Sequence, residues 1–278
     1  MEFLEFLKVF LLGIVEGITE WLPISSTGHM ILLDEFIKLD VSEAFMEMFL
    51  VVIQLGAIAA VPLIFWDKLY PFSKKKSREE RDRTLHLWGK VIVGVLPAAV
   101  LGFLLDDLLD QYLYNYIVVA LALVVYGVLF IIVEKNRAEK EFRVENVYDL
   151  SYTDALKIGA FQVLSLIPGT SRSGSTILGG MLTGVSRTAS AEFSFFMAIP
   201  IMLGASGLKL LKFILDGFTA SGTEIALLLV GIIVSFAVSL FVIKFLMDFV
   251  KRHDFSVFGI YRIALGALVL LYFIIRAI

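Results

Sequence analysis

The sequence of 278 residues contains no cysteine and only three histidines. The absence of cysteine excludes disulfide bonds, thiolate zinc sites and cysteine-ligated iron–sulfur clusters. Net charge is also small, because 24 Lys and Arg residues nearly balance 27 Asp and Glu residues and leave a formal net charge of −3. A balance so close to neutral gives no indication of a nucleic-acid partner.

Apolar residues are what the sequence has in excess. They make up 59% of the chain, and the mean hydropathy is +0.88, whereas a soluble domain is about 45–50% apolar. The excess forms blocks of about twenty residues, each long enough to cross a bilayer as a helix. We therefore predict an all-α, polytopic membrane protein with a single membrane domain over residues 1–278. The predicted full transmembrane helices are residues 44–66, 88–105, 117–134, 189–211, 224–247 and 257–276.

Two further apolar blocks, roughly residues 3–33 and 154–183, are interrupted near their middles. The stretch "WLPISSTGH" interrupts the first block, and "LIPGTSRSG" interrupts the second. Irregular backbone is not tolerated in contact with lipid, so each interruption must be buried in protein or line a water-filled cavity. We predict two re-entrant helical hairpins, with two continuous spans that carry polar kinks as the alternative.

The two interrupted blocks align with each other at a shift of 146 residues (159 − 13). Each block is followed by three predicted spans, so the second copy enters the membrane from the opposite face. This predicts an inverted-topology repeat of residues 1–134 and 154–276, joined by a cytoplasmic loop at 135–153, with a site near the bilayer midplane. The aligned pairs are Gly13 with Gly159, Glu16 with Gln162, Ser25 with Ser171, Gly28 with Gly174, Ile31 with Ile177 and Leu32 with Leu178.

Lysine and arginine gather on one side of this arrangement, in the predicted loops at 67–87, 135–153 and 248–256. The opposite side offers "DEFIKLDVSE" and "DDLLDQYLYN", which contain only one lysine, Lys38. Because basic loops face the cytoplasm, the basic side is predicted to be cytoplasmic. Both termini and the opening of the site are then predicted to be extracytoplasmic.

The first interruption carries ionisable groups at lipid depth. Glu16 and Glu20 are four residues apart and so lie on one face of a helix. The repulsion between two such carboxylates is relieved by a shared proton, a nearby cation or a bound divalent metal with oxygen ligands. Ser25, Ser26 and Thr27 follow and open a second half-helix, and His29 lies one turn inside it. This grouping favours a functional histidine over a structural one.

The second interruption carries Arg172 among glycines and hydroxyls. Arginine stays charged and recognises phosphate through a planar fork of donors, while the start of a half-helix presents free N–H groups. The two interruptions together predict a site for a metal-associated phosphate or diphosphate. The residues expected to bind phosphate are Ser25, Thr27, Gly169, Ser171, Ser173, Gly174 and Thr176. Those expected to support the site from around it are Glu47, Gln54, Gln162 and Glu192.

The sequence also resembles a known family. "EGITEWLPISSTGH" at residues 16–29 and "PGTSRSGST" at residues 168–176 resemble signature motifs of the undecaprenyl-diphosphate phosphatases, the bacitracin-resistance membrane proteins of bacteria. The resemblance covers essentially the whole chain and includes "QLG" from Gln54, "GVSRTASAEFSF" from Gly184 and "IYR" from Ile260. It implies hydrolysis of undecaprenyl diphosphate to undecaprenyl phosphate and inorganic phosphate in the bacterial inner membrane, which recycles the lipid carrier for cell-wall synthesis.

The resemblance implies roles for particular residues. Glu16, Glu20, Ser26, His29 and Arg172 match the family's functional positions, and a divalent cation, Mg²⁺ or Ca²⁺, is expected at the two glutamates. Ser26 is the predicted nucleophile and His29 the predicted general acid or base, with Glu20 as the alternative base for Ser26. Direct attack by water or by His29 also stays open. The implied partners are a polyprenyl diphosphate and membrane lipids. A homodimer is one alternative for the oligomeric state, and a lipid transporter or flippase is the alternative function.

Overall fold

The computed structural model describes residues 2–113, 115–137 and 141–277; residues 138–140 of the predicted connecting loop lie outside it. The described residues are helical and contain one isolated parallel bridge, between Val144 and Val185, so the all-α prediction is confirmed. The helices are α1 (Glu2–Thr19), α2 (Ser26–Phe36), α3 (Glu43–Val52), α4 (Gln54–Ile64), α5 (Trp66–Leu69), α6 (Arg78–Leu113), α7 (Tyr116–Arg137), η1 (Val147–Asp149), α8 (Tyr152–Val163), η2 (Leu164–Leu166), α9 (Arg172–Leu182), α10 (Arg187–Leu215), α11 (Gly222–Phe249) and α12 (Ser256–Ala277).

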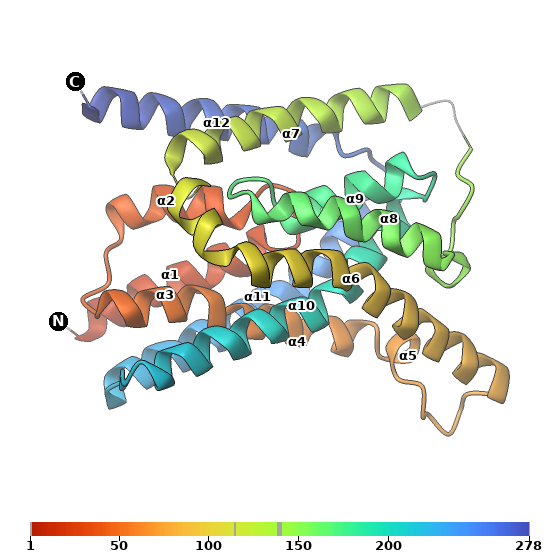
Figure 1. Ribbon diagram of the computed structural model, residues 1–278, viewed down its shortest axis with the longest axis horizontal. Helices are drawn as coiled ribbons and strands as arrows, with labels where there is room; N and C mark the ends of the chain where they lie inside the picture. The colour runs from red at the N-terminus through yellow and green to blue at the C-terminus, as the bar shows by residue number, and fades with distance from the viewer. Residues whose placement is uncertain (1, 114, 138–140, 278) are drawn as a thin grey trace.

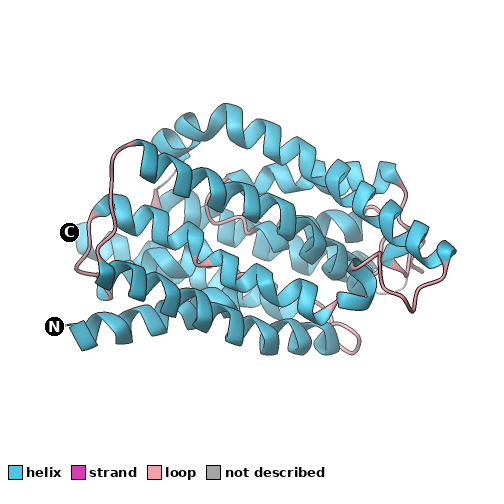
Figure 2. Cartoon of the chain, turned by 90° about the horizontal axis from the view of Figure 1, so that it is seen from below, coloured by secondary structure: helices cyan, strands magenta, loops and turns pink. Residues whose placement is uncertain are grey.

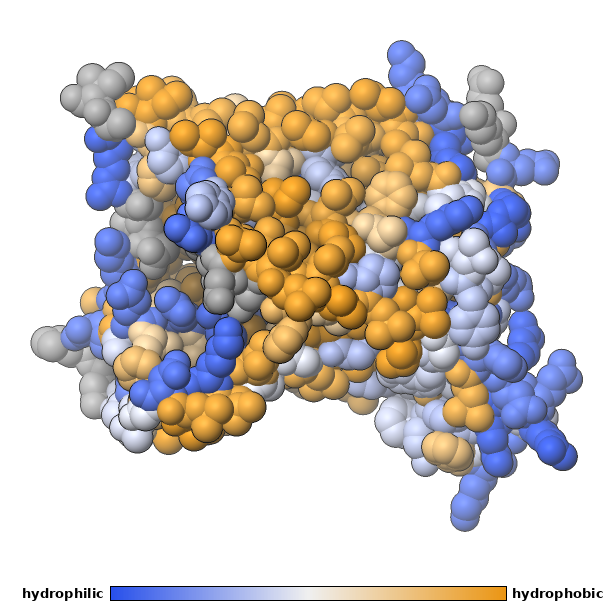
Figure 3. All heavy atoms as spheres, in the orientation of Figure 1, coloured by the Kyte–Doolittle hydropathy of each residue, from blue (hydrophilic) through white to orange (hydrophobic). Residues whose placement is uncertain are grey.

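Six helical segments of the described chain are long and apolar enough to cross a membrane, and each overlaps one predicted span. They lie roughly along one direction, and both chain ends lie at the same end of the molecule (Figures 1 and 2). Hydrophobic side chains form a broad band between two polar ends (Figure 3). This is the pattern of a multi-pass membrane protein. The segments are Glu43–Ile64, Arg78–Leu105, Tyr116–Arg137, Arg187–Leu215, Gly222–Phe249 and Ser256–Arg276.

The segment predicted as a basic loop at 67–87 is partly helical, which corrects the sequence prediction. Helix α6 begins at Arg78 and runs for 36 residues to Leu113, beyond the predicted span at both ends. Ser77 and Glu80 explain its start, because Glu80 N donates to Ser77 Oγ at 3.2 Å and Ser77 N donates to Glu80 Oε2 at 2.7 Å. This reciprocal cap starts a helix in polar sequence, where hydropathy gives no signal.

Both predicted interruptions are present. Helix α1 ends at Thr19 before α2 begins at Ser26, and α8 ends at Val163 before α9 begins at Arg172. Figure 1 shows that the α1–α2 pair opens toward the end that carries the termini, whereas the α8–α9 pair opens toward the other end. The tips of the two pairs therefore approach each other from opposite directions.

The same backbone turn starts the second helix of each pair. Ser25 and Ser171 have φ angles of 74° and 73°, a region that non-glycine residues seldom adopt. Each serine caps the following helix, because Ser25 Oγ accepts from Gly28 N at 3.3 Å and Ser171 Oγ accepts from Gly174 N at 3.1 Å. The cap offsets part of the strain of this backbone conformation.

Small residues let the interrupted pairs pack closely against long helices. Helix α1 packs along α11, and α8 packs along α6. A Cβ atom added at Gly159 would lie 2.1 Å from the carbonyl oxygen of Gly94, and one added at Gly13 would lie 3.1 Å from that of Gly231. Close approach of helix backbones at small residues is a principal source of helix association in lipid. These contacts hold both tips in the interior of the helical bundle.

Candidate active site

The tips of the two interrupted pairs line one cavity of about 270 Å³. Helices α4, α6 and α10 complete its wall. The polar lining residues are Glu20, Ser26, Thr27, Gln54, Gln162, Ser165, Ser171 and Arg172. The apolar lining residues are Ala98, Leu166, Ile201, Met202 and Ala205, together with Gly169 in the second tip. The lining of the cavity thus combines polar groups, most of them from the tips, with apolar side chains, most of them from the long helices.

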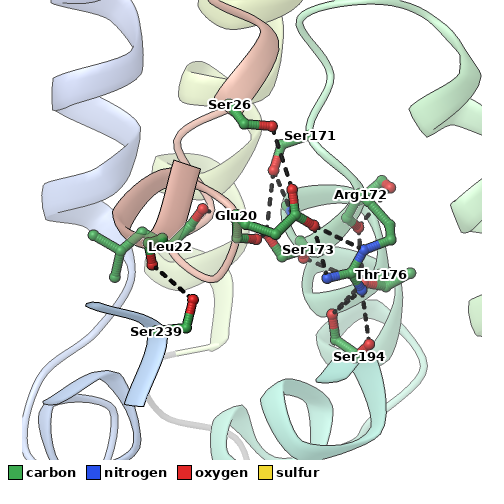
Figure 4. Close-up of polar contacts among 12 residues, drawn as sticks. Glu20, Leu22, Ser26, Ser171, Arg172, Ser173, Thr176, Ser194 and Ser239 are labelled. Carbon is green, nitrogen blue, oxygen red and sulfur yellow. Dashed lines mark hydrogen bonds and ion pairs between the residues drawn. The ribbon is translucent and has the colours of Figure 1, made fainter. Parts of the chain in front are cut away.

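The carboxylate of Glu20 lies between a hydroxyl and a guanidinium (Figure 4). Ser26 Oγ donates to Glu20 Oε2 at 3.3 Å. Arg172 Nε and Nη2 donate to Glu20 Oε1 at 3.3 and 3.2 Å, so the two interruptions are joined by an ion pair in which Glu20 is 7% exposed. A carboxylate placed this way can accept a proton from the hydroxyl while the arginine balances its charge.

A hydrogen-bond network fixes the other side of the Arg172 guanidinium. Arg172 Nη1 donates to the Ser194 carbonyl oxygen at 2.8 Å, and Thr176 Oγ1 donates to Ser194 Oγ at 2.7 Å. All three donor nitrogens of Arg172 therefore have a partner, either Glu20 in the first tip or Ser194 on α10. These contacts hold a rigid planar donor group at the wall of the cavity.

Several residues predicted to bind phosphate make hydrogen bonds within the protein that position the tips and their surroundings. Ser173 Oγ lies 3.0 Å from the Glu20 carbonyl oxygen and donates to it, so the start of α9 is anchored to the end of α1. Ser25 and Gly174 form the helix caps described above, and Thr176 supports Ser194 behind the arginine. Of the predicted phosphate-binding set, Thr27, Gly169 and Ser171 line the cavity.

The carboxylates of Glu16 and Glu20 fit the expected divalent cation in chemistry. Glu16 is 2% exposed, and its Oε1 has no hydrogen-bond partner. Carboxylate and hydroxyl oxygens are the ligands that Mg²⁺ and Ca²⁺ prefer. No group of three or more His, Asp or Glu side chains that could hold a metal occurs among the described residues, so further ligands would come from hydroxyls, substrate and water, as is usual for Mg²⁺.

Comparison with known proteins places this architecture in a family. The family model described as bacitracin resistance protein BacA matches residues 9–268. The chain belongs to this family. A protein named undecaprenyl-diphosphatase from Enterococcus faecalis is 58% identical over 273 residues, which is 98% of each chain. Proteins of the same name from Desulfitobacterium hafniense and Acetivibrio thermocellus are 56% identical over 279 residues and 58% identical over 271 residues, covering 98–100% of this chain and 98–99% of the relatives.

Arg262 is a residue of this BacA-family site that sequence reasoning missed. It is fully buried, and it donates to the carbonyl oxygens of Pro23 at 3.1 Å, Gly169 at 2.9 Å and Thr170 at 2.8 Å. One side chain from α12 therefore ties both tips together. A single arginine inside an otherwise apolar span is costly in lipid, and that signal could have singled it out.

His29 lies beside the site in a direction that the sequence did not predict. Its Nδ1 lies 2.7 Å from the Ser25 carbonyl oxygen, and its Nε2 lies 2.6 Å from the hydroxyl of Tyr261 on α12. The two rings are stacked with centroids 5.6 Å apart. His29 is absent from the cavity lining, whereas Ser26, three residues earlier, is in it.

Of the four residues expected to support the site, the structure brings Gln54 and Gln162 to the cavity. Glu47 lies elsewhere, in a surface hollow where Lys209 Nζ donates to its Oε2 at 3.4 Å. Glu192 pairs with Lys68 at 2.6 Å and does not line the cavity. Glu47 lies two turns before Gln54 along the chain, and Glu192 lies near the start of α10, whereas the α10 residues that line the cavity lie in its middle.

Proposed function

We propose that the protein hydrolyses undecaprenyl diphosphate to undecaprenyl phosphate and inorganic phosphate. The observation that carries the proposal is the buried contact of Ser26, Glu20 and Arg172, which joins a hydroxyl, a carboxylate and a guanidinium in one cavity. Near-full-length identity to proteins named undecaprenyl-diphosphatase supports the same reaction. The apolar lining residues suit the polyprenyl chain, while the polar lining residues suit the diphosphate.

The contact between Ser26 and Glu20 supports a two-step mechanism. Ser26 Oγ attacks the terminal phosphorus, its proton passes to Glu20, and the bond to the bridging oxygen breaks to release undecaprenyl phosphate. Water then attacks the phosphoserine and releases inorganic phosphate. Of the two bases that the sequence left open for Ser26, His29 and Glu20, this mechanism uses Glu20, because His29 is engaged with Ser25 and Tyr261.

Arg172 stabilises the negative charge that develops on the transferring phosphoryl group. Its planar donors are held by Ser194 and Glu20 before substrate arrives, so little reorganisation is needed. A divalent cation bound by Glu16 and Glu20 would neutralise diphosphate charge and polarise the phosphorus. The unpartnered Glu16 oxygen supports this assignment.

We also propose that the α1–α2 and α8–α9 pairs are re-entrant hairpins of an inverted-topology repeat of residues 1–134 and 154–276. The matching turns at Ser25 and Ser171 support it, as does the packing of α1 on α11 and of α8 on α6. Because the basic loops lie at the end opposite the termini, we assign both termini and the opening of the site to the outer face of the bacterial inner membrane.

Cysteine labelling tests the orientation. A cysteine at Ser77, before α6, should be protected from an impermeant thiol reagent in intact cells, and a cysteine at the exposed Gln111, near the other end of α6, should react. The chain has no native cysteine to interfere. The reverse labelling pattern would place the α1–α2 opening on the cytoplasmic face.

Phosphate release by the purified protein tests the reaction. In detergent, where no gradient exists, we expect release of inorganic phosphate from undecaprenyl diphosphate, loss of release with a chelator, and recovery with Mg²⁺ or Ca²⁺. A transporter or flippase would release no phosphate under these conditions.

Acid quenching with labelled diphosphate tests the nucleophile and should trap an acid-stable phosphoserine. An acid-labile, base-stable adduct would indicate His29, and no adduct would favour direct attack by water.

A further inference from the structure

The cavity contains a polar side chain that the mechanism above does not use. Gln162, near the end of α8, lines the cavity and is 1% exposed. Neither its amide nitrogen nor its amide oxygen has a hydrogen-bond partner. Its backbone is well held, because the hydroxyl of Ser165 donates to the Gln162 carbonyl oxygen at 2.6 Å. The position is therefore fixed while the amide group is left without a partner.

An unpartnered buried amide is costly, and nearly all buried polar side-chain atoms in proteins find a partner. Leucine is similar in size and would fill this position on α8 without that cost. The amide is best explained by a ligand that completes its hydrogen bonds when the cavity is filled. The cavity is also large enough for ordered water, which can donate to the amide oxygen.

The position of Gln162 indicates which part of the ligand it meets. The phosphoryl group that is transferred must lie against Ser26 and Arg172. The phosphate that stays on the lipid is attached to the polyprenyl chain and must lie toward apolar lining residues. Leu166 lies one turn after Gln162, and α8 packs along α6, which contributes the apolar lining residue Ala98. Gln162 thus lies on an element that also brings apolar side chains to the cavity.

We propose that the Gln162 amide nitrogen donates a hydrogen bond to an oxygen of the phosphate that stays on the lipid. The proposal rests on the diphosphatase function given above and names a substrate-binding residue for it. A neutral donor holds this phosphate without competing with Arg172 for the charge that develops on the transferred group. It also retains the product less strongly than a second cationic group would, which favours release of the lipid monophosphate.

The test replaces Gln162 with leucine and measures substrate and both products separately. In Gln162→Leu, the KM for undecaprenyl diphosphate should rise about ten-fold or more, because a hydrogen bond to a charged group is lost. The inhibition constant of undecaprenyl phosphate should rise by a similar factor. The inhibition constant of inorganic phosphate should stay within about two-fold, because that phosphate binds at Arg172.

Two measurements separate this role from a structural one. The thermal midpoint of Gln162→Leu in detergent should equal or exceed that of wild type, since the substitution removes two unpartnered groups. Gln111→Leu, at an exposed position of α6, is the matched control and should leave all constants unchanged. If Gln162→Leu fails to fold, Gln162→Glu keeps the size, and its carboxylate should repel the retained phosphate and raise KM further.

Specific results would overturn the inference. The inference is wrong if Gln162→Leu leaves both the KM and the inhibition constant of undecaprenyl phosphate unchanged. It is also wrong if Gln162→Glu binds undecaprenyl phosphate as tightly as the wild-type protein does. Equal increases for both products would indicate general damage to the cavity instead. Failure of the proposed function is distinguishable, because the wild-type protein would then release no phosphate at all.

Discussion

The two interrupted pairs have the same backbone turn and opposite chemistry. At the shift that aligns Ser25 with Ser171, the next residue is Ser26 in one copy and Arg172 in the other. The turn aims this position at the shared cavity from both directions, so one copy supplies a hydroxyl and the other a guanidinium. The difference teaches that one local structure, used twice, can deliver two chemically different groups, a hydroxyl and a guanidinium, to the same cavity.

The same contrast holds one helix earlier in each copy. Glu16 and Gln162 align, and each has buried side-chain atoms without a hydrogen-bond partner. The first copy carries the acid that suits a cation, and the second carries the neutral amide that suits a phosphate oxygen. The predictions below test how far this division between an acidic copy and an anion-binding copy extends.

The largest effect is expected at Ser26, and the adjacent Ser25 is its control. Ser26→Ala should lower kcat on the order of 10³-fold or more, because it removes the nucleophile. Ser25→Ala should lower stability by about 1 kcal/mol through loss of the helix cap, with a much smaller change in kcat. Phosphate release and thermal unfolding in detergent measure the two effects. Similar kcat values in the two variants would remove the distinction between the serines.

Arg172→Lys should lower kcat/KM by about 100-fold, because lysine keeps the charge but loses the planar fork that contacts Glu20 and Ser194. Arg187→Lys is the matched control. Arg187 also pairs with a buried glutamate, Glu134, through two nitrogens, but it does not line the cavity. The control substitution Arg187→Lys should lower the thermal midpoint with little change in kcat/KM. Near-native turnover of Arg172→Lys would leave Arg172 only a long-range electrostatic role.

Arg262→Lys tests whether the two copies must be tied together. One ammonium cannot reach the carbonyl oxygens of both Pro23 and Gly169 with the geometry that the guanidinium provides. We expect a loss of about 2 kcal/mol of stability and a fall in kcat of about ten-fold, as Ser26 and Arg172 lose their alignment. The exposed Arg252 provides the control substitution, Arg252→Lys. An unchanged kcat would show that the tips hold their positions without this link.

The smallest effect concerns the support of Arg172. Ser194→Ala removes the hydroxyl that accepts from Thr176 and, at 3.4 Å, from Arg172 Nη1, but it keeps the carbonyl oxygen that accepts from Arg172 at 2.8 Å, so kcat/KM should fall only about three- to ten-fold. Ser190→Ala, one turn earlier on α10, removes a buried hydroxyl without a partner and should change neither activity nor stability. Equal behaviour of the two variants would show that the Thr176 contact does not position Arg172.

Sequence reasoning predicted the spans and the two interruptions, because they depend on local composition. Blocks of apolar residues, proline and glycine specify where helices cross and where they break. It failed at the start of α6, where Ser77 and Glu80 begin a helix in polar sequence. It also could not distinguish Thr27, which lines the cavity, from Ser173, which holds the tips together.

The sequence by itself determined the membrane-spanning helices, the paired serine turns and the kinds of side chain at the site. Only the tertiary structure decided which of them meet. Glu20 and Arg172 are far apart in the chain, and their contact follows from the packing of α1 on α11 and of α8 on α6. The contact of His29 with Tyr261 and the contacts of Arg262 with both tips likewise follow from helix packing, because Tyr261 and Arg262 both lie on α12. Hydropathy and spacing fix a residue's position along its helix, but the direction of its side chain depends on neighbours that are distant in sequence.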